Sequence, residues 1–383
     1  MAKGAEFAGS VVEEVELLQA TEPPIGLGIV DVEVSPTAHK RPHPIDDSDD
    51  EGAESDGDAV GSKVRILDNE SADPEDWLVA VFEGTEAEES AMIKAEIKKE
   101  FDEQLDFWDT TMVAEYAEEI FEYMGQLEES AMPHPRYMDH QTEIQWSMRT
   151  TLVDWLLQVH VRYHMLPETL WIAVNIVDRF LSNRVVSLVK FQLVGVTAMF
   201  IAAKYEEIMA PSVDEFVFMT EGGYTRDEIL KGERIILQSL EFNISPYCSP
   251  YSWVRRISKA DDYDIQTRTL SKFLMEVTLL DHRFLRAKPS MIAAIGMYVA
   301  RRMLGGDWNE AFIYYADFTQ LELAIPSDFL LELIAADDFD QKFVYKKYSS
   351  KKFLKASIFA RNWARSNPPI AGSDQSVSPE PSS

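Results

Sequence analysis

Cysteine is nearly absent from this sequence: Cys248 is the single one in 383 residues. An internal disulfide framework is therefore excluded, and the chain fits a reducing compartment, the cytosol or the nucleus. Basic residues are also few, with 36 Lys and Arg against 66 Asp and Glu, a formal net charge of −30. This charge repels nucleic acid and anionic membrane surfaces, so we expect neither as a partner. The longest apolar run, residues 193–203, is too short to span a bilayer and predicts a buried helix.

Sequence motifs for catalysis are missing as well. The sequence contains no P-loop, and the stretch around Gly26 and Gly28 lacks the third glycine of a phosphate-binding loop. His160 and His164 lie four residues apart on a predicted helix and could grip a metal, but no HExxH or Cys/His cluster supplies further ligands. We therefore interpret the two histidines as a partly buried structural pair and not as metal ligands. We therefore expect a chain that is not an enzyme and that binds no metal and no cofactor.

The first 110 residues are strongly acidic, with 30 Asp and Glu against 8 Lys and Arg. Residues 44–58 (PIDDSDDEGAESDGD) carry hardly any apolar side chain that could nucleate packing. We therefore expect residues 1–108 to form a disordered acidic region and residues 366–383 to form a disordered tail.

A short amphipathic helix is predicted directly after this acidic region. Cap-forming residues begin near Asp109, and apolar residues follow at helical spacing. These apolar residues are Val113, Tyr116, Ile120 and Tyr123.

The rest of the chain indicates an all-α fold, because no sustained alternation of apolar and polar residues argues for strands. The prolines of NISPYCSP (residues 243–250) separate two helical blocks of similar size, which suggests a structural duplication. We expect domains at residues 109–245 and 246–365. The predicted helices lie near residues 142–164, 167–182, 188–208, 212–220, 225–241, 265–281, 289–304, 308–316 and 326–336.

The predicted helix that contains MRTTLVDWLLQVH has two apolar faces. Met148, Leu152 and Trp155 share one face, whereas Arg149 lies on another. Either both faces pack in the core, or one packs and the other is left as a docking surface. On a core-side face Arg149 needs an acidic partner, because an unpaired buried guanidinium is too costly. Asp178 on the next helix is the expected partner.

The predicted helix at residues 191–208 is apolar around almost its whole circumference, so it should be the central helix of its block. At its C-terminal end Lys204 stands next to Glu206 and Glu207. Such a cluster is either a solvated helix end or a polar clamp for a partner. A stripe of small residues would let neighbouring helices approach closely: Gly195, Ala198 and Ala202.

These patterns together resemble a cyclin, specifically a fungal B-type mitotic cyclin, from Tyr137 to about Trp363. The motifs that carry the resemblance are MRTTLVDWL, VNIVDRFLS, FQLVGVTAMFIAAKYEEI, GERIILQSLEFNI, RRISKADDYDIQTRTL and KKYSSKKFLKAS. The resemblance implies two tandem five-helix cyclin boxes behind a short N-terminal helix, and no catalysis by the chain itself. It implies a regulatory subunit that binds and activates a mitotic cyclin-dependent kinase at the G2/M transition, in the nucleus and cytoplasm.

The resemblance also assigns roles to individual residues. Lys204 and Glu233 match the pair that grips the backbone at the ends of the kinase's mobile helix. Neighbouring kinase contacts match Tyr205, Glu206, Glu207, Phe242 and Ile244. The kinase-facing side of the N-terminal helix matches Tyr116, Ile120 and Tyr123.

A second surface implied by the resemblance docks short Arg-x-Leu motifs of substrates. Its residues match Met148, Leu152, Trp155, Phe191 and Gln192. Gln158 stands where A-type cyclins carry Glu, which favours the B type.

The sequence departs from the family in its N-terminal region. Arg41 and Arg65, the only arginines in the first 110 residues, do not begin an RxxL destruction box, and no Lys-Glu-Asn triplet is present. An incomplete gene model, a non-degraded paralogue and another degron all remain open, with ubiquitin ligase machinery as a further partner.

Ser35 and Ser378 each precede a proline, so they fit the pattern of proline-directed phosphorylation. An unmodified serine fits the sequence equally well at both positions. The alternative function is a transcription-type cyclin or a cyclin-fold transcription factor.

Overall fold

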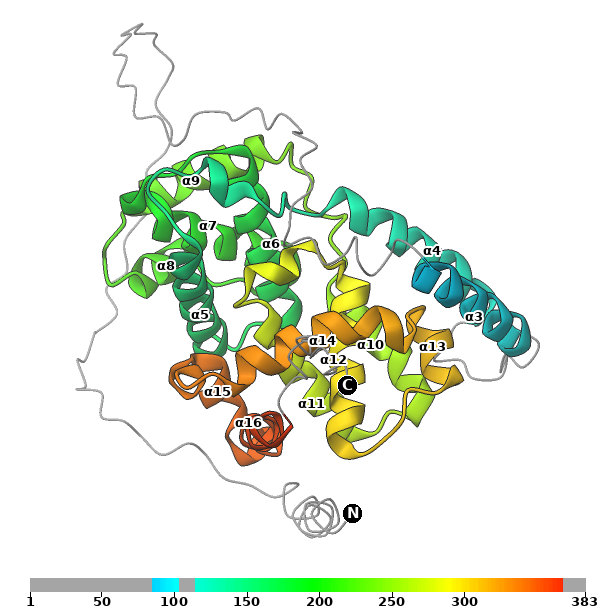
Figure 1. Ribbon diagram of the computed structural model, residues 1–383. Helices are drawn as coiled ribbons and strands as arrows, with labels where there is room; N and C mark the ends of the chain where they lie inside the picture. Colours follow the sequence, from blue (N-terminus) through cyan, green and yellow to red (C-terminus); the bar gives the residue numbers. More distant parts are fainter. Residues whose placement is uncertain (1–84, 103–113, 368–383) are drawn as a thin grey trace, which may run out of the picture. The chain divides into compact units, whose positions relative to one another are not determined.

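The computed structural model describes residues 85–102 and 114–367. Within these ranges the chain forms helices joined by loops and no β-strand (Figure 1). The all-α class predicted from the sequence is therefore confirmed. Short 3-10 helices punctuate the loops: η2 (Tyr137–His140), η3 (Ser258–Asp261), η4 (His282–Arg286), η5 (Phe339–Gln341) and η6 (Lys351–Phe353).

The first domain is built around one buried apolar helix. Its five helices are α5 (Trp146–Arg162), α6 (Pro167–Asn183), α7 (Leu188–Glu206), α8 (Val213–Met219) and α9 (Arg226–Ser239). Helix α7 contacts the other four, as expected for a helix that is apolar on all sides. By length and composition α7 could cross a membrane, but 67% of its most apolar window is buried inside the protein. It is therefore the core helix of this domain.

The second domain repeats this arrangement. Its helices are α10 (Pro250–Ile257), α11 (Ile265–Thr278), α12 (Pro289–Leu304), α13 (Glu310–Ala316) and α14 (Gln320–Ala335), followed by α15 (Phe343–Tyr348) and α16 (Ala356–Ser366). Helix α12 contacts α10, α11, α13 and α14, as α7 contacts its own four neighbours. The expected structural duplication is thus present as two five-helix units. The sequence prediction missed α10, α15 and α16, and it started α14 at Pro326, six residues too late.

A glycine in each central helix allows a neighbouring helix to approach closely. A Cβ atom on Gly195 of α7 would lie 2.7 Å from Leu152 of α5, and one on Gly296 of α12 would lie 2.8 Å from Met275 of α11. Neither position has room for a side chain without a shift of its neighbours. For Gly195, this is the close approach that the small-residue stripe predicted.

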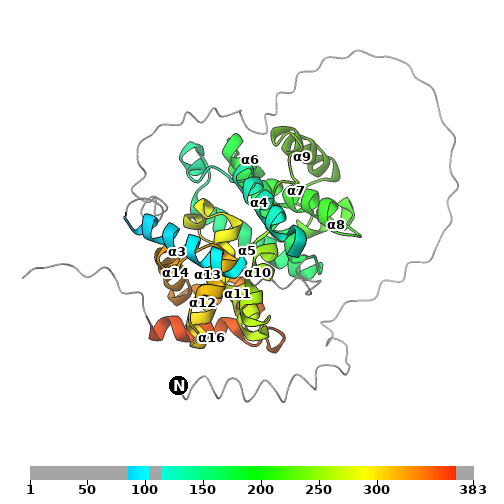
Figure 2. The same ribbon diagram turned by 90° about the vertical axis from the view of Figure 1, so that its right-hand side faces the viewer.

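Within the part of the chain that the structure describes, two helices precede the first domain. Helix α4 (Ala114–Ser130) continues the predicted amphipathic helix, whose start at residues 109–113 lies outside the described residues. Helix α3 (Thr85–Asp102) packs against α13 and α14 (Figures 1 and 2). The expectation of disorder was therefore wrong for residues 85–102. The remainder of residues 1–108, including Ser35, and the tail from residue 368, including Ser378, lie outside the described residues.

Candidate functional site

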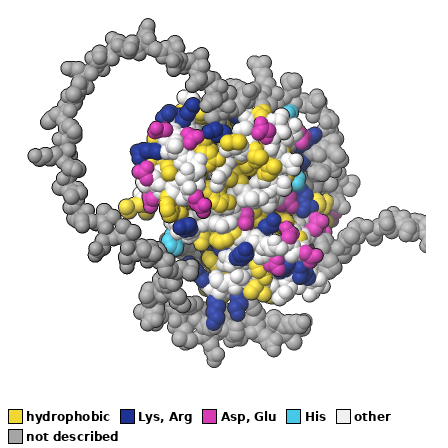
Figure 3. Space-filling view, turned by 90° about the vertical axis from the view of Figure 1, so that its left-hand side faces the viewer, with side chains coloured by type: hydrophobic (Ala, Val, Ile, Leu, Met, Phe, Trp, Pro, Cys, Tyr) yellow, Lys and Arg dark blue, Asp and Glu magenta, His cyan; other side chains and the backbone are white. Residues whose placement is uncertain are grey.

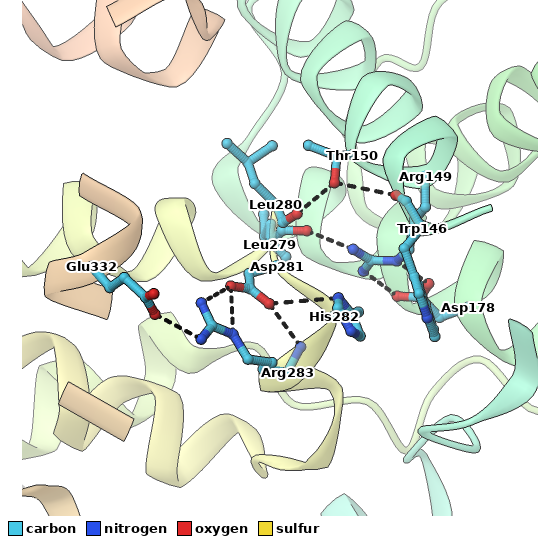
Figure 4. A network of polar contacts seen from close by, with 10 residues as sticks. All are labelled: Trp146, Arg149, Thr150, Asp178, Leu279, Leu280, Asp281, His282, Arg283 and Glu332. Atoms are coloured by element: carbon cyan, nitrogen blue, oxygen red, sulfur yellow. Dashed lines mark hydrogen bonds and ion pairs between the residues drawn. The ribbon is translucent and has the colours of Figure 1, made fainter. Parts of the chain in front are cut away.

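The buried pair Arg149 and Asp178 joins α5 to α6. The guanidinium Nε and Nη2 of Arg149 donate to the two carboxylate oxygens of Asp178 at 2.7 and 2.8 Å. The Tyr137 hydroxyl donates to the same carboxylate at 2.8 Å. Arg149 is only 2% exposed, so this two-point pairing is what makes its burial tolerable. The pairing predicted from the sequence is present (Figure 4).

The electrostatics of this pair keep its donors protonated. Burial alone would lower the pKa of Arg149, but the charge and hydrogen bonds of Asp178 outweigh burial and raise it. Burial and the negative charge of Asp178 raise the pKa of Tyr137 well above its ordinary value. Both side chains therefore remain donors at any physiological pH.

The same end of α5 also binds the second domain. Arg149 Nη1 donates to the carbonyl of Leu279 at 2.8 Å, and the Thr150 hydroxyl donates to the carbonyl of Leu280 at 2.8 Å. The Trp146 indole stacks on His282 with ring centroids 4.5 Å apart. Figure 4 shows these residues converging from both domains. Arg149 therefore fixes the domain junction as well as the first domain.

A second buried polar cluster, centred on Glu276 of α11, was not anticipated from the sequence. Glu276 is 1% exposed and accepts from Lys347 at 2.7 and 2.8 Å and from the Tyr348 hydroxyl at 2.7 Å. The Tyr251 hydroxyl also donates to it, at 3.2 Å. The partners lie 25 to 72 residues away in sequence, so no local pattern could have revealed the cluster.

Lys204 and Glu233, expected at the kinase interface, form an ion pair between α7 and α9. The Lys204 side chain is 45% exposed and that of Glu233 is 12% exposed. The Lys204 ammonium also lies 4.4 Å from the centre of the Phe200 ring, a cation–π contact. Glu233 lies in the middle of α9 and is largely buried. The pair thus presents one accessible cation over a shielded carboxylate.

The neighbours of this pair divide into exposed and structural residues. Tyr205 and Phe242 are large, apolar and exposed, so they are available to a partner. Glu207 instead accepts from the Leu166 N–H at 2.7 Å and from the Thr169 hydroxyl at 2.5 Å, at the start of α6. Ile244 is buried in the core. Partial burial and the charges of Glu168 and Glu207 raise the pKa of Glu206.

Helix α4 has one face packed and one face free. Tyr116, Ile120 and Tyr123 are exposed, as required of the contact surface expected there. On the packed side the Phe121 ring lies 5.3 Å from the Trp253 ring, and the Arg256 guanidinium lies 4.3 Å from the Phe121 ring centre. This arrangement holds α4 on the second domain while Tyr116, Ile120 and Tyr123 face outward.

The buried carboxylate of Glu128 fastens the end of α4 to the start of α12. It accepts from the Ser290 N–H at 2.7 Å and from the Ser290 hydroxyl at 2.8 Å. Burial raises the pKa of Glu128 to about 7, although the bonds from Ser290 and the charge of Lys288 partly oppose this rise. The sequence reading did not single out this residue.

The six residues expected to dock substrates differ in accessibility. Leu152 and Phe191 are buried core residues, and Leu152 packs on Gly195. Met148 and Trp155 are half-buried against the core, and Gln158 and Gln192 are exposed. In Figure 3 the face that carries α5 and α8 has apolar side chains gathered across its centre among charged ones. Such a surface suits a short segment with an apolar anchor.

The histidine pair does not converge on a common point. His160 is buried and its Nε2 lies 3.1 Å from the Leu166 carbonyl oxygen, whereas His164 is exposed. Burial lowers the pKa of His160. Among the described residues no group of three or more His, Cys, Asp or Glu is arranged to hold a metal ion.

Comparison with known families agrees with this architecture. Residues 119–245 match the cyclin N-terminal domain and residues 248–362 match the cyclin C-terminal domain. The chain therefore belongs to the cyclin family.

Within the cyclin family, the similar proteins are fungal G2/mitotic cyclins, as the motifs predicted. A G2/mitotic-specific cyclin of Schizosaccharomyces pombe is 51% identical over 270 residues, which cover 70% of this chain and 56% of that protein. G2/mitotic-specific cyclin-B of Emericella nidulans is 51% identical over 265 residues, 68% of this chain and 54% of that one. This chain spans just over half the length of these relatives. A viral cyclin from herpesvirus saimiri aligns at TM-score 0.49 and 16% identity, over 55% of this chain and 97% of that one.

Proposed function

We propose that this chain is a non-catalytic regulatory subunit that binds and activates a mitotic cyclin-dependent kinase at the G2/M transition. The observation that carries the proposal is the exposed Lys204, paired with Glu233 and flanked by exposed Tyr205 and Phe242. The relatives described as G2/mitotic-specific cyclins support the same function. They also favour it over a transcription-type cyclin or a cyclin-fold transcription factor.

The mechanism we propose is a population shift in the kinase. A kinase without its cyclin holds its regulatory helix away from the position that catalysis requires. A rigid surface that fits only the inward position stabilises the active state through its binding free energy. On binding, Lys204 and Glu233 would exchange their mutual contact for backbone groups of that helix. The exchange costs little, because a partly exposed ion pair is worth about 0 to 1 kcal/mol.

Substrate recruitment and degradation belong to the same proposal. The half-buried and exposed residues beside Leu152 would capture short docking motifs, with Met148 and Trp155 supplying apolar contact and Gln158 and Gln192 supplying polar contact. Ubiquitin ligase machinery would be a further partner. The chain would work in the nucleus and cytoplasm.

Lys204→Ala combined with Glu233→Ala tests the kinase interface. Each lost charge-assisted hydrogen bond costs about 1.5 to 3 kcal/mol, so kinase affinity should fall by about two to four orders of magnitude if the losses add. Affinity and histone-kinase activation are measured after circular dichroism has verified the fold. Arg226→Ala is the matched control, since it removes an exposed ion pair with Asp214 in the same domain. A folded double variant that binds and activates the kinase like wild type would refute the placement of the interface.

A further inference from the structure

Helix α3 contacts the second domain through one stripe of side chains. Its buried and half-buried positions recur every three or four residues, the spacing of a single helix face. These positions are Ala87, Ser90, Ile93, Lys94, Ile97 and Phe101. The opposite face is exposed and mostly charged. Helix α3 therefore lies on the protein surface with a defined side inward.

The inward side makes polar contacts that depend on position. The Ser90 hydroxyl lies 2.9 Å from the Thr319 hydroxyl, and these two residues are 1% and 3% exposed. One turn further along, Lys94 donates to the Glu322 carboxylate at 2.9 Å and to the Asp317 carbonyl at 3.4 Å. Glu322 also closes the capping box of α14 through Thr319. A carboxylate and a carbonyl at the junction of α13 and α14 thus form a notch for an ammonium group.

Two further contacts extend the interface along α3. The Phe101 ring stacks on Tyr314 of α13 with centroids 5.0 Å apart. On the outward side, Lys98 pairs with Glu118 of α4 at 2.7 Å. Helix α3 consequently touches α13, α14 and α4.

We propose that α13 and the start of α14 form a helix-docking surface, and that α3 occupies it in cis as a clasp. The surface selects a helix with a small hydroxyl residue, a lysine four residues later and an aromatic residue seven residues after that lysine. Three residues of α3, namely Ile93, Ile97 and Phe101, supply its large buried or half-buried apolar side chains. The buried polar contacts of Ser90 and Lys94 add specificity to this apolar contact. A docking of this composition is specific yet weak enough to open without unfolding the domain.

The clasp has a consequence that rests on the proposed function. Helix α4 carries Tyr116, Ile120 and Tyr123, and α3 contacts it through Lys98 and Glu118. With α3 docked, the Lys98–Glu118 pair adds to the contacts of Phe121 and Glu128 that hold α4 on the second domain before the kinase arrives. Such preorganisation lowers the ordering cost of binding, so an open clasp should weaken kinase affinity.

Ser90→Asp combined with Lys94→Met in the full chain tests the clasp by hydrogen exchange. The aspartate would face Glu322, and the lysine that neutralises Glu322 would be gone. Backbone amides of α3 should exchange at least about tenfold faster than in wild type, the loss expected for one charge-assisted hydrogen bond. Amides of α7 and α12 should keep their protection, which shows that both domains remain folded. Lys99→Met, at an exposed position of the same helix, should leave exchange in α3 unchanged.

Three outcomes would overturn the clasp. These are unchanged α3 exchange in Ser90→Asp/Lys94→Met, unprotected α3 amides in wild type, and equal loosening by Lys99→Met. If the double variant loses protection throughout, Phe101→Ala replaces it, and unchanged α3 exchange in that variant counts against the proposal. Kinase affinity is measured on the same proteins. A wild-type chain that binds no kinase would refute the proposed function, while hydrogen exchange would still decide whether α3 docks.

Discussion

Two ion pairs in this molecule show how burial decides what a charge can do. Arg149 is 2% exposed and uses Nε, Nη1 and Nη2 within the protein, on Asp178 and on the carbonyl of Leu279. The Lys204 side chain is 45% exposed, and its ammonium contacts Glu233 and the Phe200 ring. The first pair has little capacity left for a partner, and the second can exchange its contact. A charge that is fully satisfied inside the fold is structural, whereas a half-satisfied one at the surface is available for binding.

The sharpest test of this contrast compares Arg149→Ala with Lys204→Ala. Removing Arg149 leaves Asp178 buried without its cation and Leu279 without its donor, so the free energy of unfolding should fall by roughly 3 to 5 kcal/mol. Lys204→Ala should change it by less than about 1 kcal/mol. Urea unfolding followed by circular dichroism measures both. Equal losses would mean that the surface pair is structural too, and a stable Arg149→Ala protein would contradict the role of the buried pair.

Within the expected docking site, substitutions should show which residues belong to the core and which to the surface, with a somewhat smaller loss of stability. Leu152→Ala should destabilise the protein by about 2 to 5 kcal/mol, because it leaves a cavity over Gly195. Gln158→Ala with Gln192→Ala should change stability by less than about 0.5 kcal/mol per site. In the kinase complex this second variant should raise KM for substrates with a docking motif and leave a simple peptide unaffected. Equal losses on both substrates would show that these glutamines do not dock substrates.

The smallest effect concerns Glu128, which is buried like Arg149 but accepts its hydrogen bonds from the neutral Ser290. Its pKa in the folded protein is about 7, above the ordinary 4.5, so the native state holds a proton that the unfolded state releases. This stabilisation is complete below about pH 4.5 and disappears as the pH rises through about 7. Between about pH 5.5 and 8, wild type should therefore lose about 2 kcal/mol of unfolding free energy relative to Glu128→Gln. Parallel pH profiles of the two proteins would contradict the raised pKa.

The sequence predicted long, strongly periodic helices better than short or polar ones. Helices α5 to α9 follow from their apolar patterns within a few residues. Helix α3 was missed because its inward stripe includes Ser90 and Lys94, which look like solvated residues until their partners on α14 are known. The start of α14 was predicted near Pro326, whereas the capping box of Thr319 and Glu322 begins the helix at Gln320.

The candidate site was predictable where partners lie on neighbouring helices. The pairing of Arg149 with Asp178 follows from the cost of burying a cation alone, and their separation is 29 residues. The carbonyl of Leu279 could not be anticipated, because a backbone acceptor leaves no signature in the sequence. Family motifs place residues in order along the chain but do not give their burial, so Leu152, Phe191 and Ile244 were expected at surfaces and lie in the core.

The bond from Arg149 to the carbonyl of Leu279 also bears on how the chain is made. The donor leaves the ribosome 130 residues before its acceptor. At roughly 5 to 20 residues per second, the first domain waits on the order of ten seconds with one N–H of this guanidinium still bonded to water. Completion of the first domain is therefore timed by translation of the second.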